Sequence, residues 1–419
     1  MIPRGQFHIP ATTLIGSFFN LWRGDYFSEV GVSSFKSDLT KHLAAKQVEL
    51  FSSCRIAFYS YLKDLNLPKG SEVLLTPITI PDMVNALVLN GLKPVFVEMD
   101  KADHSFNISD LKNKISGNTK LILSTSLCGL RPKNRELFEI SKENNLLYIE
   151  DISQSPVQNY FEQDHCAQVT VISLSVGKTI TTLVGGALAF GEKSTFKRPE
   201  FHSYPLKDYF KRQLRENLKI DIFTSPFIYR FFTRFCLALL SIFNKDYYFN
   251  IHKQNLVSKY NELDIFFDDI PVLRVEFPKN LFFRFNSWMA KLGQATLNNW
   301  HSSLSRRKAH RELFLREASD KLKSITAANF SEDDYFPLRA PFYVERPEEF
   351  QLFCIKRGLD CGNYGLNLCN EEEVFQEFRQ SLPISREIKE HCFFLNLNEK
   401  LKRDDIVKSI KILNDYFGE

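Results

Sequence analysis

Short apolar segments alternate with helix-like segments between residues 73 and 190, and this alternation restricts the fold more than any other feature. Each apolar run has the length of a strand, and most successive runs are separated by a segment with helical spacing. The expected strands are 73–76, 94–99, 121–126, 146–149, 169–172 and 187–190, with helices at 81–90, 107–115 and 131–145. Strands joined by helices form right-handed crossovers in a mostly parallel sheet. We therefore expect an α/β fold that binds its ligand at the carboxyl ends of the strands.

Polar side chains stand where these strands end. Ser126, Asp151 and Ser173 each follow an apolar run, and the loop after Ser173 carries Lys178. A lysine held in a dry site loses its proton more easily and can form a Schiff base with an aldehyde or ketone. Taken singly, the lysine is better explained by a solvated loop, and the aspartate is explained equally well by a cap on the next turn.

The segment before the first crossover predicts a phosphate site. Residues 35–50 have helical apolar spacing, and Ser52 and Ser53 then precede a second amphipathic helix that extends to Leu62. Serines of this kind cap helix N-termini, where free N–H groups can hold a phosphate; a plain capped helix is the alternative. A loop lysine, an acid at a strand end and a polar helix N-terminus are together what pyridoxal 5'-phosphate (PLP) requires.

Several short motifs occur in an order that resembles a known family. They are Pro77-Ile-Thr79, Gly91 to Asp100, Ile149 to Gln154, Ser173 to Gly186, and Arg284 to Gly293. In this order and spacing they resemble the DegT-like family of PLP-dependent sugar aminotransferases, which have the aspartate-aminotransferase fold. The resemblance covers residues 35–190 and 281–417, which is most of the chain.

The resemblance assigns the chemistry to three polar side chains. It implies that Lys178 forms the Schiff base and moves the proton between the substrate carbon and the cofactor. It also implies that Asp151 pairs with the pyridine nitrogen and that Gln154 hydrogen-bonds near the cofactor's 3-hydroxyl. No residue spacing in the sequence predicts a metal site.

The resemblance also places the cofactor's phosphate and ring. Ser173 would bind the phosphate together with the backbone N–H groups of Cys54 and Arg55. Ile80 would pack against the ring at a position where the family commonly has an aromatic residue. This chain also departs from the family at Cys54, which replaces a glycine, and at Val184, which replaces a glutamate. At Phe282 it lacks the asparagine that reaches the partner subunit's cofactor.

The length of 419 residues favours more than one domain. The expected division is a large PLP-binding α/β domain at 1–195, a hydrophobic helical insertion at 196–265, a bridging long helix within 266–325 and a small C-terminal α+β domain at 326–419. The bridging helix is expected at 288–322, with Arg306, Arg307 and Arg311 on its solvated face. In the C-terminal domain we expect strands near 336–344 and 393–397 and a closing helix at 403–417.

The insertion is rich in phenylalanine, leucine and isoleucine, with basic residues between them. Pro226 divides residues 210–249 into two expected helices. One interpretation is a helical hairpin that covers the enzyme or its dimer interface. The other is an amphipathic surface that makes peripheral contact with a membrane.

Charge and cysteine usage restrict the class of protein. The net charge of +4 is small for this length, and no basic stripe with interleaved aromatics predicts a nucleic-acid partner. The 8 cysteines form no Cys-x-x-Cys pair, which is typical of a reducing compartment. We find neither a signal peptide nor an apolar run long enough to span a bilayer, so we expect a cytoplasmic protein, membrane-associated at most through 210–249.

The resemblance therefore implies a homodimeric aminotransferase with active sites near the subunit interface. Its expected reaction moves an amino group from an amino acid, with glutamate the expected donor, to a keto group of a nucleotide-linked sugar in cell-surface polysaccharide or glycoconjugate biosynthesis. Two alternatives remain open. One is a PLP-dependent sugar dehydratase, against which Lys178 argues. The other is a non-catalytic binding or scaffold protein on the same fold.

Overall fold

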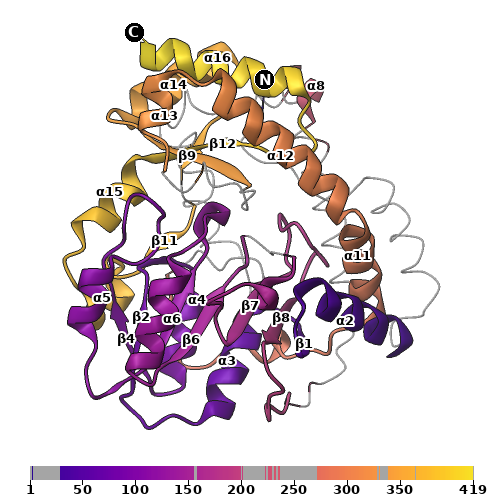
Figure 1. The fold of residues 1–419 in the computed structure, drawn as a ribbon, viewed down its shortest axis with the longest axis vertical. Helices are drawn as coiled ribbons and strands as arrows, with labels where there is room; N and C mark the ends of the chain where they lie inside the picture. The colour runs from indigo at the N-terminus through magenta and orange to yellow at the C-terminus, as the bar shows by residue number, and fades with distance from the viewer. Residues whose placement is uncertain are drawn as a thin grey trace.

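A seven-stranded sheet forms the centre of the larger part of the molecule (Figure 1). The computed structural model describes residues 2, 29–154, 158–199, 201, 222, 225–228, 231–232, 235, 271–327, 330, 338–363 and 365–418. Within them the strand order is β1-β8-β7-β6-β5-β2-β4. The five strands from β7 to β4 are parallel, while β8 runs antiparallel to both of its neighbours. The prediction of a mostly parallel sheet is confirmed.

The elements of this part follow the predicted alternation. The strands are β1 (Gln47–Phe51), β2 (Glu72–Leu75), β3 (Ile78–Thr79), β4 (Lys93–Phe96), β5 (Thr119–Thr125), β6 (Leu147–Asp151), β7 (Val169–Ser173) and β8 (Gly186–Phe190). The helices are α2 (Glu29–Leu43), α3 (Cys54–Leu65), α4 (Pro81–Leu89), α5 (Ile108–Lys114) and α6 (Asn134–Glu143). Pro81 occupies the first turn of α4, where its missing N–H costs nothing. The carboxyl ends of β5, β6 and β7 all meet at one edge of the sheet.

The segment 35–50 is a helix followed by a strand, and the prediction of one helix is wrong at its end. Helix α2 stops at Leu43, and Ala44 takes a left-handed conformation with φ 53°. Residues 47–51 then pair antiparallel with 186–190. Short apolar runs fit either helical or strand spacing, and the available edge of β8 decides between them.

The smaller part of the molecule contains a three-stranded antiparallel sheet with the order β10-β12-β9. Its elements are β9 (Arg339–Tyr343), α14 (Pro347–Arg357), β10 (Gly362–Asn363), β11 (Asn367–Leu368), α15 (Pro383–His391), β12 (Cys392–Asn396) and α16 (Arg403–Gly418). We call residues 338–418 the C-terminal unit. Strand β11 leaves it to pair with β3, so the two parts share a two-stranded sheet. The predicted strands and closing helix of this unit are confirmed within a few residues.

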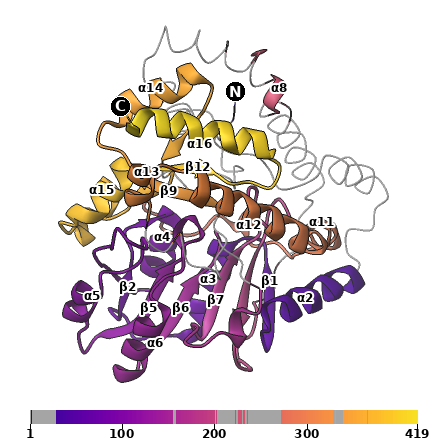
Figure 2. The same ribbon diagram turned by 45° about the horizontal axis from the view of Figure 1, so that its top comes forward.

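Helices bridge the two parts, and the single helix predicted at 288–322 is wrong because it is broken. The segments are α11 (Ser287–Asn298), α12 (Trp300–Glu317) and α13 (Asp320–Ser324). Helix α11 packs on α2, whereas α12 packs on α16 (Figure 2). Arg307 and Arg311 lie on the buried face of α12, contrary to the predicted solvated face, while Arg306 is exposed.

The predicted hairpin and membrane surface at 210–249 lie outside the described residues, except for a few positions. Among those, α8 (Pro226–Ile228) begins at the proline that was expected to divide the helices, and Phe227 and Phe231 are exposed. No described helix is long and apolar enough to cross a membrane. The domain boundaries near 195, 265 and 325 stay predictions.

Candidate active site

A cavity of about 320 Å³ lies at the carboxyl edge of the large sheet. The structure brings to its walls every residue predicted for the cofactor site, namely Cys54, Arg55, Ile80, Asp151, Gln154, Ser173 and Lys178. These residues come from four segments of the chain, at 54–55, 80, 151–154 and 173–178, which the fold brings to one edge of the parallel sheet. Ser126 follows the same edge but bonds to the buried carboxylate of Glu150 instead of lining the cavity.

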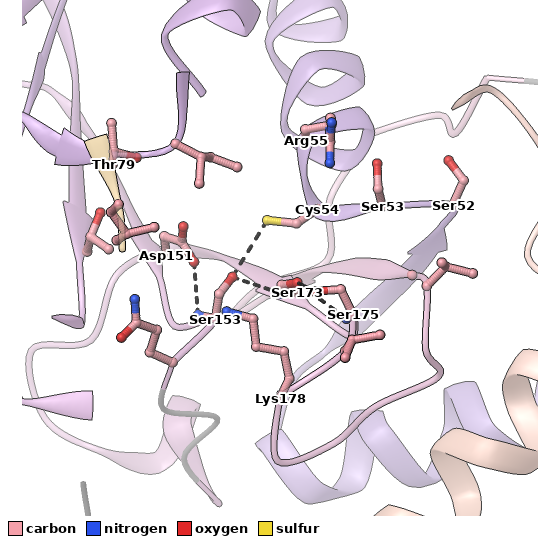
Figure 3. A pocket seen from close by; sticks show the side chains of 17 residues that line it. Ser52, Ser53, Cys54, Arg55, Thr79, Asp151, Ser153, Ser173, Ser175 and Lys178 are labelled. Carbon is pink, nitrogen blue, oxygen red and sulfur yellow. Dashed lines mark hydrogen bonds between the residues drawn. The ribbon is translucent and has the colours of Figure 1, made fainter. Parts of the chain in front are cut away.

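The lysine stands on a short loop that connects β7 to β8. Backbone hydrogen bonds from Leu174 N to Gly185 O (2.9 Å) and from Val176 N to Leu183 O (3.1 Å) close the base of this loop. At its tip, Gly177 has φ 80°, which favours glycine. The next residue, Lys178, is half-buried and points toward Asp151 and Ser153 (Figure 3).

Asp151 ends β6 as a buried carboxylate in the wall of the cavity. Its Oδ1 accepts a hydrogen bond from the backbone N–H of Ser153 at 2.9 Å. Burial raises the pKa of the Asp151 carboxyl, while the Ser153 hydrogen bonds and the nearby Lys178 charge act in the opposite direction. A cationic group in the cavity would further stabilise the ionised form of Asp151.

Ser153 connects the two sides of the cavity, and the sequence analysis did not single it out. Its Oγ accepts from the N–H of Ser173 at 2.8 Å and lies 3.6 Å from the Cys54 sulfur (Figure 3). Ser173 in turn is hydrogen-bonded to Ser175, Oγ to Oγ, at 2.8 Å. The only sequence signal for these two serines was their place inside the strand-end motifs, two residues after Asp151 and Ser173.

The N-terminus of α3 reaches the cavity because β8 begins with a glycine. Ser53 caps the helix, with its Oγ accepting the N–H of Ile56 at 3.3 Å, so the predicted cap is confirmed. A Cβ on Gly186 would lie 2.2 Å from the Cys54 nitrogen, closer than any real contact. The first amides of α3 and the lysine loop can therefore approach each other only with glycine at this position.

Arg55 lines the cavity, but its side chain belongs to a buried ionic cluster. Its guanidinium donates to Asp82 at 2.7 Å, and Arg274 donates to both oxygens of Asp82 at 2.5 and 3.1 Å. Asn85 completes the cluster by donating to Asp82 at 3.1 Å. Sequence analysis predicted Arg55 as a site residue. It did not predict Asp82 and Arg274 as partners of Arg55, because both lie far from it along the chain.

Gln154 and the apolar lining close the rest of the cavity. The Gln154 Oε1 accepts a hydrogen bond from the backbone N–H of Cys128 at 2.8 Å. The amide nitrogen of Gln154 therefore points away from Cys128. Ile80 and Leu366 add apolar surface. Leu366 lies just before β11 in the C-terminal unit, which pairs with β3. Sequence reasoning could not indicate Leu366, because only the tertiary pairing brings it to the cavity.

The comparisons with known proteins agree with this geometry. A sequence model of the DegT/DnrJ/EryC1/StrS aminotransferase family matches residues 22–218. The match covers slightly less than half of the chain, and it shows a likeness to this family in that region. A GDP-perosamine synthase of Escherichia coli O157:H7 is 26% identical over 169 residues, which cover 40% of this chain and 46% of the relative. The chain thus spans about half the length of the relatives it matches.

Solved structures extend the likeness of the fold to the whole chain. Helicobacter pylori PseC, an aminotransferase involved in the biosynthesis of pseudoaminic acid, has a TM-score of 0.69 at 14% identity, with both chains covered completely. NtdA of Bacillus subtilis has a TM-score of 0.67 at 15% identity, covering 97% of this chain and 82% of its own, and was solved with bound cofactor PMP. The predicted aspartate-aminotransferase fold is confirmed.

The family depends on PLP, and the cavity fits that cofactor. An amine, a buried carboxylate and a hydroxyl-lined helix N-terminus surround one space, and these are the groups that PLP requires. Gly186 keeps that helix end close to the lysine loop, where a side chain would displace it. The individual roles assigned to these residues stay predictions.

Proposed function

We propose that this protein is a PLP-dependent aminotransferase that moves an amino group from an amino acid to a keto group of a nucleotide-linked sugar. The observation that carries the proposal is the meeting of Lys178, Asp151 and the α3 N-terminus around one cavity of about 320 Å³. The sugar class is supported by relatives such as the GDP-perosamine synthase. A spore coat polysaccharide biosynthesis protein of Bacillus subtilis, 22% identical over 159 residues, supports a place in polysaccharide or related glycoconjugate biosynthesis.

The side chains have separate tasks in this proposal. PLP supplies an aldehyde carbon and an electron-withdrawing ring when bound. Lys178 would hold the cofactor through its Nζ, and the same amine would take and return the proton at the substrate carbon. Asp151 keeps the ring nitrogen protonated, because a buried carboxylate is stabilised by an adjacent cation.

The other lining residues bind and orient. Ser173 and the amides of Cys54 and Arg55 would hold the phosphate, because the positive end of the α3 dipole favours an anion. Gln154, whose Oε1 accepts from Cys128 N, would offer its amide nitrogen to the cofactor's 3-hydroxyl. Ile80 would pack on the ring as an aliphatic side chain, and its apolar surface would help to exclude water.

The test is the absorbance of the purified protein with added PLP. Lysine-bound PLP absorbs near the visible edge, so wild type should gain that band and Lys178→Ala should lack it. Lys193→Ala, which changes an exposed lysine after β8, is the matched control and should keep the band. Adding glutamate should then remove the band from wild type if glutamate is the donor. No band in wild type would reject the enzyme and favour the binding or scaffold alternative.

The proposal includes a homodimer, as the resemblance implies. Sedimentation equilibrium of the purified protein should give twice the mass of 48.8 kDa. A monomer that still shows the lysine-bound band would reject the dimer and leave the chemistry in place.

A further inference from the structure

Side chains of the bridging helices hold the lysine loop from outside the cavity. On α11, Thr296 Oγ1 accepts the N–H of Thr181 at 3.1 Å. On α12, Arg307 donates through its Nη1 to the hydroxyl of Thr179 at 3.0 Å. Thr179 directly follows Lys178, so this second bond fixes the residue adjacent to the reactive amine.

The same arginine also binds the C-terminal unit. Its Nε donates to Glu399 Oε2 at 3.1 Å, and Glu399 lies in the loop after β12. One turn along α12, the His310 ring donates to the Leu397 carbonyl of that loop at 3.1 Å. Arg307 therefore joins the loop of Lys178 to the C-terminal unit through a single side chain.

The burial of this link makes it rigid. Arg307 is 3% exposed, Thr179 4% and Glu399 8%. The guanidinium is planar and its donors point in fixed directions, so moving one partner displaces the other. An ion pair this dry is also costly to break, because one charge would be left without compensation.

The two neighbours of the lysine in the chain differ in how firmly they are held. Gly177, on one side, has open space around its Cα, with nothing within 4 Å of an added Cβ. Thr179, on the other side, is buried and held by Arg307. The Lys178 backbone is therefore held from the Thr179 side by Arg307, in addition to the hydrogen bond that its own N–H donates to Ser175 O at 3.3 Å.

We propose that Arg307 and Glu399 are positioning residues for Lys178, so that the C-terminal unit sets where the lysine stands in the cavity. This rests on the proposed function, in which Lys178 must reach both the aldehyde carbon and the substrate carbon. Reactions of this kind lose large factors in rate when a group moves by about 1 Å. Neither positioning residue lines the cavity.

The experiment compares Thr179→Val with Thr179→Ser in the full chain with added PLP. Valine keeps the shape of threonine but removes the acceptor for Arg307, whereas serine keeps the acceptor. We expect Thr179→Val to slow the appearance of the lysine-bound band at least about tenfold and to shift the pH at which that band titrates. The amount of PLP held at saturation should stay the same, and Thr179→Ser should restore the wild-type rate.

A second experiment compares Arg307→Met with Arg311→Met as a matched pair. Both arginines are 3% exposed on α12, one turn apart, but Arg311 donates to the Phe330 carbonyl at 2.8 Å. Both variants should lose stability, and only Arg307→Met should slow the lysine reaction.

The outcomes separate this inference from the proposed function. A normal band with a wild-type rate in Thr179→Val would overturn the positioning role and leave the aminotransferase proposal standing. Equal slowing in Arg307→Met and Arg311→Met would overturn it as well, because the effect would then follow general loss of packing. If wild type shows no band, the proposed function fails and this inference fails with it.

Discussion

Replacing Gly186 with alanine tests the geometry on which the cavity depends. The added Cβ would lie 2.2 Å from Cys54 N, 2.3 Å from Ser53 C and 2.5 Å from Cys54 Cα. All three atoms belong to backbone at the start of α3, so no side chain can rotate away to make room. Ordinary contact begins at 3.4 Å, so β8 and α3 must separate by about 1.2 Å.

The expected loss of folding stability follows from that displacement. Overpacking of a core costs about 1–3 kcal/mol, and a clash between two backbone segments belongs at the upper end, about 3 kcal/mol. The shift also moves the first amides of α3 away from the phosphate site. Losing one hydrogen bond to a charged group costs about 1.5–3 kcal/mol, which corresponds to at least tenfold weaker PLP binding.

Urea unfolding and PLP titration together measure both effects. Gly117→Ala is the matched control, because Gly117 has an ordinary φ and no atom lies within 4 Å of its added Cβ. That variant should change stability by less than about 0.5 kcal/mol and leave PLP binding unchanged. If Gly186→Ala were as stable as Gly117→Ala and bound PLP equally well, the close approach of β8 to α3 would be refuted.

Three further substitutions test the buried ionic cluster and a buried histidine by denaturant unfolding. Asp82→Asn leaves the buried Arg55 without its carboxylate and should lower the free energy of unfolding by about 3 kcal/mol. Arg274→Gln lies nearer the surface and should lower it by about 1 kcal/mol. Equal losses in the two variants would contradict the cluster. Burial lowers the pKa of His104, which contacts the Tyr343 hydroxyl at 2.9 Å, from 6.5 to about 3. Its contribution is complete above about pH 6.5 and is lost as the pH falls toward 3, so His104 alone should cost about 1.4 kcal/mol between about pH 7.5 and 5.5. His104→Asn, which tolerates the φ of 55°, should remove that part of the slope and leave the part due to His42, whose pKa burial lowers to about 4; an unchanged slope would contradict it.

The sheet and the centre of the site were predictable because local signals and tertiary structure agree there. Apolar runs separated by helices specify parallel crossovers, and parallel strands bring their carboxyl ends to one edge. Asp151, Ser173 and Lys178 could therefore be grouped from the sequence alone. The Gly185-Gly186 pair was a further signal, and the structure gives its physical reason in the contact with α3.

The walls of the site were less predictable, because they depend on contacts between distant segments. Residues 47–50 were expected to be helical, and only pairing with β8, nearly 140 residues later, makes 47–51 a strand. Leu366 reaches the cavity because β11 pairs with β3 across the two parts of the molecule. Arg55 was expected to contribute only its backbone, and nothing near it in the chain indicated Asp82 as the partner of its side chain.

The arginines of α12 show most clearly why positioning could not be deduced from the sequence. An arginine on a long helix is normally solvated, since burying its charge is costly without a partner. Arg307 finds its partners 92 residues away in Glu399 and 128 residues away in Thr179. Both become neighbours only because α12 crosses between the large sheet and the C-terminal unit. The residues that react can thus be recognised by local motif, whereas those that hold the reactive lysine in place are determined by how the two parts pack.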